Sequence, residues 1–161
     1  MASRVVSNTG PILHLTEIDF INVFNTFSHI FIPEEVANEL RKNKVIIPKK
    51  IKVITIKSEF KDIVKILTNQ HNLDLGEAQA ISLTMQEKSD YFLTDDLDAR
   101  EVAKSYNLEV HGTIGIILRA FREKIIDKKT AIEKINDSHT KSSLFITKDL
   151  IEQTIRAING F

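Results

Sequence analysis

The chain has 161 residues, a length typical of one domain that can bury a sizeable core. Lys and Arg together number 22, as do Asp and Glu, so the net charge is near zero and any charge-based function must be local. The absence of cysteine excludes disulfide scaffolds, thiolate metal sites and thiol nucleophiles. No run approaches the roughly 18 apolar residues of a membrane-spanning helix, and no signal-peptide pattern is visible. We therefore expect a soluble, cytoplasmic protein without membrane contact, folded as a single domain over residues 1–161.

Short β-branched runs alternate with helical patterns along the chain. We predict strands at Arg4–Asn8, His29–Ile32, Ile51–Ile56, Tyr91–Thr94 and Glu109–His111. We predict helices from Pro11 onward, at Pro33–Asn43, Glu59–His71, Gly76–Lys88, Leu97–Tyr106 and Gly112–Phe121, and, as a C-terminal extension from about residue 127, at Asp127–Asn136 and Thr147–Ile158. The last helix has one apolar side, which packs either on its own core or on a second subunit.

This alternation predicts an α/β fold in which a parallel sheet is covered by helices on both faces, a three-layer α/β/α sandwich. In such folds ligands bind beyond the carboxyl ends of the strands, where the strand order reverses. Candidate functional residues are therefore sought directly after each strand.

Three carboxylates follow the fourth predicted strand, at Asp95, Asp96 and Asp98. An Asp in this position commonly caps the next helix, by accepting hydrogen bonds from its first free N–H groups. Capping explains one of the three but not easily all of them, because close carboxylates repel one another. A functional acidic site and simple helix capping both remain open.

Two further acids lie on helix faces that should be buried, and one amide ends the first strand. Glu77 shares a face with Ala80 and Ile81, although its place in the first turn also suits the helix dipole. Glu39 falls on the apolar stripe of its helix, which is too short to exclude a surface position. Asn8 should lie at the same sheet edge as Asp95, where it serves either a local turn or a cation.

Together, Asn8, Glu39, Glu77, Asp95 and Asp96 form a candidate set of oxygen ligands from separated segments. Oxygen donors are typical of Mg²⁺ or Mn²⁺ sites. Zinc is disfavoured because there is no cysteine and the five histidines show no paired spacing. We assign no role to any histidine.

The neutral total conceals a basic segment from Leu40 to Ser58, which carries seven Lys or Arg and no acid. Such a patch steers a polyphosphate toward an acidic metal site, and nucleic acid is the natural candidate. The alternative is that these lysines only keep an exposed edge strand soluble and prevent it from pairing with another chain. Few aromatics look exposed for stacking on bases. The candidate RNA-binding residues of this segment are Arg41, Lys42, Lys49, Lys50 and Lys52.

Four stretches of the sequence resemble the PIN-domain superfamily, and more narrowly its small prokaryotic single-domain branch. They are VVSNTGPILHL (5–15), IPEEVANELRK (32–42), LDLGEAQAISL (73–83) and FLTDDLDAREVAKSYNLEVHGTIGIILRA (92–120). The resemblance implies a Rossmann-like fold with a five-stranded parallel sheet, an acidic Mg²⁺ or Mn²⁺ site and endoribonuclease activity on single-stranded RNA. Many small members resemble the toxin of a toxin–antitoxin pair, form homodimers and are inhibited by an antitoxin protein.

The resemblance also implies roles for individual positions. Glu39, Glu77, Asp95 and Asp96 match the family's acids, and Asp96 is slightly favoured over Asp95. Second-tier candidates are Thr9, Thr113 and Asp98, of which the two threonines match small hydroxyl positions near the site. The sequence departs from the family at Asn8, where catalytically competent members typically carry Asp.

Three hypotheses remain open. In the first, the chain is a metal-dependent ribonuclease. In the second, it is a catalytically weak or silent PIN scaffold that binds RNA or a partner protein. In the third, its acids only cap helices and its lysines only keep the surface solvated. The missing charge at Asn8 favours weaker metal binding than a full set of acids would give.

Overall fold

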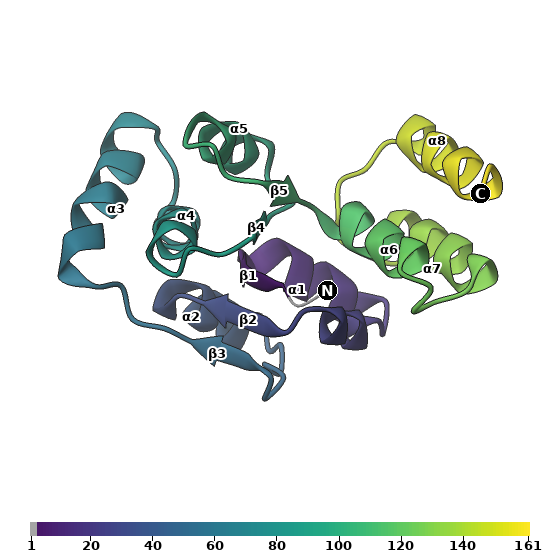
Figure 1. The fold of residues 1–161 in the computed structure, drawn as a ribbon, viewed down its shortest axis with the longest axis horizontal. Coiled ribbons are helices and arrows are strands. Elements are labelled where there is room, and N and C mark those ends of the chain that lie inside the picture. Colours follow the sequence, from purple (N-terminus) through teal and green to yellow (C-terminus); the bar gives the residue numbers. More distant parts are fainter. Residues whose placement is uncertain (1–2) are drawn as a thin grey trace.

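A computed structural model describes residues 3–161 (Figure 1). Within this range no helix is long and apolar enough to cross a membrane. The elements in chain order are β1 (Arg4–Ser7), α1 (Thr9–Glu17), the 3₁₀-helix η1 (Ile21–Thr26), β2 (His29–Ile32), α2 (Glu34–Lys42), β3 (Ile51–Val53), α3 (Ser58–Gln70), α4 (Leu75–Gln86), β4 (Tyr91–Leu93), α5 (Leu97–Ser105), β5 (Val110–His111), α6 (Thr113–Arg122), α7 (Lys128–Thr140) and α8 (Lys148–Asn159).

The strands of the described chain form one five-stranded sheet in the order β3-β2-β1-β4-β5, and all pairs are parallel. The central strand β1 pairs with β2 on one side and β4 on the other, so that Val6 aligns with both Phe31 and Phe92. The strand order reverses between β1 and β4, which opens a crevice beyond their carboxyl ends. The α/β prediction is confirmed, and so is the five-stranded parallel sheet.

Helices cover both faces of this sheet (Figure 1). Helices α3, α4 and α5 pack against one another on one face, with α4 on β1 and β4. On the other face, α1 packs on β1 and contacts η1, α2 and α6. Val5 and Val6 are consequently fully buried between the layers, which is why β1 reads as a run of β-branched residues.

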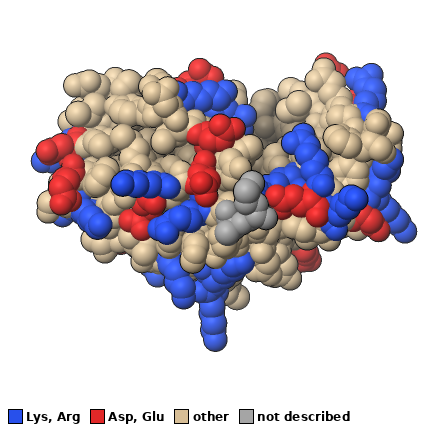
Figure 2. All heavy atoms as spheres, viewed as in Figure 1, with Lys and Arg blue, Asp and Glu red and all other residues tan. Residues whose placement is uncertain are grey.

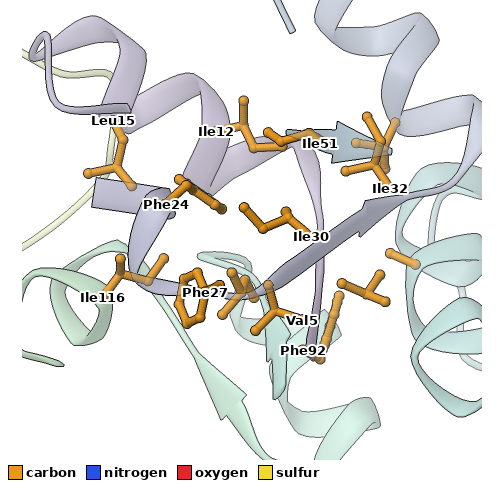
Figure 3. Packing of buried hydrophobic residues seen from close by; sticks show 14 of the residues in the cluster. Val5, Ile12, Leu15, Phe24, Phe27, Ile30, Ile32, Ile51, Phe92 and Ile116 are labelled. Atoms are coloured by element: carbon orange, nitrogen blue, oxygen red, sulfur yellow. The ribbon is translucent and has the colours of Figure 1, made fainter. Parts of the chain in front are cut away.

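One apolar cluster joins the layers. Part of it is drawn in Figure 3, where Phe27, the residue directly after η1, lies between Ile116 of α6 and Val5 of β1. These three side chains are at most 2% exposed, and burial of such side chains is worth about 1.5–3 kcal/mol each. The cluster fixes the sheet against α1 and α6 and so fixes the crevice above it.

Three elements differ from prediction by more than two residues. The third strand ends at Val53 rather than Ile56. At Thr55 and Lys57 the backbone bonds to the Gln86 side chain of α4 instead of to a neighbouring strand. Gln86 accepts from Lys57 N–H (2.8 Å) and donates to Thr55 C=O (3.1 Å). Helix α7 continues to Thr140, four residues beyond the predicted end. The short helix η1 was not predicted.

The C-terminal helix packs on its own chain. Helix α8 contacts α7, and its residues Ile151 and Ile158 are at most 4% exposed. The apolar side seen in the sequence is therefore covered in part by the protein's own core. Leu150, on the same helix, stays 47% exposed.

Candidate metal centre

A cavity of about 280 Å³ lies beyond the carboxyl ends of β1 and β4, at the reversal of strand order. The structure brings all five predicted ligand candidates to its walls: Asn8, Glu39, Glu77, Asp95 and Asp96. They arrive from the ends of two strands and from two helices, α2 and α4. Parallel strand ends meeting at one edge explain why residues nearly 90 positions apart become neighbours.

The first turn of α4 holds Glu77 in a capping box. Asp74, the N-cap residue, accepts from Glu77 N–H through Oδ1 (2.8 Å), and Glu77 accepts from Asp74 N–H through Oε2 (3.0 Å). Glu77 thus occupies the first turn, which suits the helix dipole as considered from the sequence, and it also lies in the cavity wall. Asp74 also lines the cavity, although sequence reasoning missed it. Its signal was the spacing D-x-x-E that defines a capping box.

Glu39 reaches the cavity from α2 through two close neighbours. The Thr9 hydroxyl donates to Glu39 Oε2, which places this second-tier candidate at the site. A Cβ atom built on Gly76 would overlap the Glu39 carboxylate. The glycine of the LGEA segment thus provides the space in which this carboxylate sits against α4.

The acids of this cavity lie close to one another. The pKa of Glu77 is raised to about 7, chiefly by burial. The negative charges of Asp74, Asp96 and Glu39 also raise this pKa. The pKa of Glu39 is raised as well, again chiefly by burial, although its hydrogen bond from Thr9 lowers it. A cation bound among these carboxylates would relieve both effects.

Asp95 is held by three donors. Its Oδ1 accepts from Thr113 N–H (2.7 Å), and its Oδ2 accepts from the Thr113 hydroxyl (2.5 Å) and contacts His14 Nδ1 (2.7 Å). The side chains of Asp95 and His14 are only 9% and 12% exposed. Thr113 therefore contacts the site as predicted. His14 was assigned no role from the sequence, where nothing indicated that α1 would bring it to Asp95.

Asp96 serves as the N-cap of α5, because its Oδ1 accepts from Ala99 N–H (2.8 Å). The prediction that one of the three acids is a cap is thus correct. Asp98 lies exposed in the first turn of α5 and is absent from the cavity wall. It therefore does not join the other candidates.

Asn8 caps α1 from the end of β1. Its Oδ1 accepts from Thr9 N–H (2.9 Å), and its Nδ2 donates to the Thr94 hydroxyl (3.3 Å). The side chain is 7% exposed. The amide oxygen thus performs the local turn role considered for this residue. Its second lone pair is still available to a cation.

Four carboxylates at the cavity share one bonding pattern. In Glu39, Asp74, Glu77 and Asp96, one oxygen accepts a hydrogen bond from the protein, and the other has no protein donor within residues 3–161. Open carboxylate oxygens suit Mg²⁺ or Mn²⁺. No three His, Asp or Glu side chains of the described chain are already grouped as metal ligands. The residues fit such a cation by donor chemistry, and binding would draw the open oxygens together.

The basic segment lies outside the cavity wall. Figure 2 shows Lys and Arg side chains gathered at the lower edge of the molecule, over β3 and the loop before it. Lys49 and Lys52 are exposed, whereas Lys50 is partly buried and donates to Asn25 C=O (3.2 Å). Arg41 and Lys42 are exposed in the last turn of α2, directly after Glu39. This helix links the basic segment to the acidic cavity.

The fold and this cavity define an α/β protein with an acidic centre at the switch point of a parallel sheet. The family model DUF3368, described as a PIN domain, matches residues 4–160. The chain therefore belongs to the PIN-domain family, as its resemblance predicted. Membership generally implies nuclease activity, and PIN domains typically bind divalent metals. A comparison with curated proteins finds no match.

Proposed function

We propose that this protein is a Mg²⁺- or Mn²⁺-dependent endoribonuclease that cleaves single-stranded RNA. The observation that carries the proposal is the set of four carboxylates with open oxygens around the crevice of a PIN domain. Such crowding of acids is costly unless a cation or several donors neutralise them. The raised pKa values of Glu39 and Glu77 support the same interpretation.

Each acid has a proposed task. Glu39, Glu77 and Asp96 hold the cation through their open oxygens, and Asp95, fixed by Thr113 and His14, presents its carboxylate in one orientation. Asn8 contributes a neutral oxygen. A bound divalent cation lowers the pKa of a water molecule and stabilises charge on phosphate oxygens, the chemistry needed for phosphodiester hydrolysis.

RNA is the proposed substrate because the basic segment begins in the last turn of α2, directly after Glu39. Its exposed cations attract a polyanion, while the acidic cavity repels phosphate until cations neutralise it. The proposed binding residues are Arg41, Lys42, Lys49, Lys50 and Lys52.

The test is cleavage of a mixed-sequence single-stranded RNA in Mn²⁺, Mg²⁺ or EDTA. Wild type should cut only with the cation, and Asp96→Asn should lose at least tenfold in rate. Asn caps a helix as well as Asp does, so the variant keeps α5 intact while losing a charge. Cleavage that persists in EDTA, or in Asp96→Asn at the wild-type rate, would contradict the proposal.

A second candidate function is favoured by Asn8. Its oxygen is committed to capping α1, and it lacks the charge of an Asp. The protein would then be a silent PIN scaffold that binds RNA without cutting it. Salt-sensitive RNA binding without cleavage by wild type, together with cleavage by Asn8→Asp, would identify this case.

Proposed partners rest on the resemblance to small prokaryotic members. In that branch a toxin forms a homodimer and is inhibited by an antitoxin protein. For this chain, a homodimer predicts a sedimenting mass near twice 18.3 kDa. A monomer at micromolar concentration would contradict it.

A further inference from the structure

A second cavity, of about 360 Å³, adjoins the metal centre. It lies between α5, the start of α6 and the connection from α7 to α8. Asp95, Leu144 and Phe145 line both cavities, so the two are adjacent. Apart from Asp95, its wall is largely apolar, with Leu97 and Leu150 at the rim, and it contains Arg100 and His111.

Arg100 is a partly buried cation that forms no ion pair within the described residues. Its Nε is buried with no hydrogen-bond partner, and its Nη2 makes one long bond to Thr94 C=O (3.4 Å). No carboxylate within residues 3–161 forms an ion pair with it. Asp95 lies close by but forms no ion pair with Arg100; its Oδ1 accepts from Thr113 N–H, and its Oδ2 contacts the Thr113 hydroxyl and His14. A buried N–H group without a hydrogen-bond acceptor is costly, and the planar fork of a guanidinium matches a phosphate group.

His111 repeats this pattern beside Arg100. Its Nε2 is also buried without a hydrogen-bond partner, and the nearest carboxylate oxygen, Oε1 of Glu109, is 3.9 Å away. Burial and the charges of Arg119, Arg100 and Arg122 lower the pKa of His111, although Glu109 raises it, and this shift favours the neutral ring. The pocket therefore offers a guanidinium and a neutral imidazole, each with an unused polar atom.

Phe145 supplies an aromatic surface at the boundary of the two cavities. It is 93% exposed, although the sequence suggested few exposed aromatics. Leu97, across the second cavity, is 73% exposed. An exposed phenyl ring beside a cationic pocket is the arrangement with which proteins bind one unpaired base and its phosphate.

We propose that this second cavity binds one nucleotide of single-stranded RNA next to the scissile phosphate, with the base on Phe145 and its phosphate on Arg100. This inference rests on the proposed function, because the nucleotide is part of that substrate. The unpaired guanidinium favours RNA over an apolar protein segment, which would leave the charge buried and unpaired.

The experiment measures binding of a fluorescent mixed-sequence RNA octamer by anisotropy. All variants carry Glu77→Gln to suppress cleavage, and a gel checks that the RNA stays intact. Gln at this position preserves the capping box. Phe145→Ala should weaken binding about 5- to 150-fold without changing its salt dependence, and Phe145→Trp should restore binding. Because Phe145 is so exposed, this variant tests the proposal without affecting folding.

Arg100→Gln tests the phosphate contact by a different readout. It should lower the slope of log Kd against log salt concentration by about 0.7, the value for one phosphate contact on a single strand. Thermal unfolding checks that the variant is folded. The controls are Phe161→Ala and Arg156→Gln, which remove an exposed phenyl ring and an exposed cation of the C-terminal segment. They should change neither the affinity for RNA nor the slope.

Parent-like affinity in both Phe145→Ala and Arg100→Gln would overturn the subsite and leave the groove to another occupant, such as a protein segment. Metal-dependent cleavage by wild type would then still support the proposed function. If wild type neither binds nor cuts RNA, the proposed function fails and the subsite fails with it.

Discussion

Glu77 shows how one side chain serves both the fold and the site. Its backbone N–H and one carboxylate oxygen complete the capping box with Asp74, while the other oxygen is open toward the cavity. Helix formation thus fixes where the carboxylate points. Its pKa of about 7 reflects chiefly the cost of burying this charge, to which the nearby acids add.

In metal-free protein, this pKa predicts a loss of stability as pH rises. Folded Glu77 keeps its proton up to about pH 7, whereas the unfolded chain loses it near 4.5. Between these values the folded state binds more protons, so the free energy of unfolding falls with increasing pH. Glu77→Gln should remove this contribution, and we expect it to be more stable than wild type above pH 7 in EDTA. Urea unfolding at pH 5 and pH 8 measures the difference.

The informative quantity is the wild-type value minus that of Glu77→Gln, which cancels the other titrating groups. A difference that does not change between pH 5 and pH 8, or that changes in favour of wild type, would contradict the burial of this acid.

Asn8 sets the charge of the site. Asn8→Asp keeps a good N-cap for α1 and adds a negative charge to the cavity. We expect Mn²⁺ affinity to rise about tenfold, which corresponds to about 1.4 kcal/mol. Stability in EDTA should fall, because the variant adds repulsion and loses the amide donor to Thr94. Calorimetric titration with Mn²⁺ measures the first effect, and unchanged or weaker affinity would argue against a cation at this position.

At the scale of elements, amphipathic helices were predicted well because each buries one face. The short strand β3 was not, because its end depends on Gln86, which contacts residues 55–57 from another element. Contacts between distant elements also limit how much of the site can be predicted from the sequence. The convergence of Glu39, Glu77, Asp95 and Asp96 follows from strand ends and helix faces, whereas His14 and Phe145 reach the cavity only through tertiary packing. Asp74 could have been predicted from the sequence, because it precedes Glu77 by the three residues typical of a capping box.

Contact between α2 and α4 positions Glu39, and Gly76→Ala tests this contact. The added Cβ would overlap the Glu39 carboxylate, so either this side chain or the helix must shift. In an open helix position the same change stabilises by about 1 kcal/mol. Here we expect a loss of about 1–3 kcal/mol from overpacking, together with weaker Mn²⁺ binding. Thermal unfolding and calorimetry measure the two effects.

The matched control is Gly115→Ala in α6, where the nearest atoms to an added Cβ are 3.6 Å away. It should be neutral or stabilising and leave Mn²⁺ affinity unchanged. Equal behaviour of the two variants would mean that Gly76 is not needed to accommodate Glu39.

For the whole molecule, the distribution of charge matters more than its zero total. Acids gather in the crevice, and cations gather over β3 and its preceding loop (Figure 2). Replacing Lys49, Lys50 and Lys52 by Gln should weaken RNA binding and reduce its salt dependence, with kcat nearly unchanged, because these side chains lie outside the cavity. Cleavage kinetics at several salt concentrations measure both quantities.

Neutralising Lys104, Lys129 and Lys148 alters the net charge equally and serves as the control, since these exposed lysines lie on α5, α7 and α8. If both triple variants raise KM equally, net charge alone acts, and the basic segment has no special part in binding.

The central claim is that carboxylates from α2, from α4 and from the turn after β4 together bind a divalent cation. Its most direct test is calorimetric titration of Mn²⁺ into EDTA-stripped wild type, Glu77→Gln and the control Glu101→Gln, an exposed acid of α5 outside the cavity wall. We expect binding by wild type and by Glu101→Gln, and at least tenfold weaker binding by Glu77→Gln. No binding by wild type, or equal affinity in all three proteins, would contradict the claim.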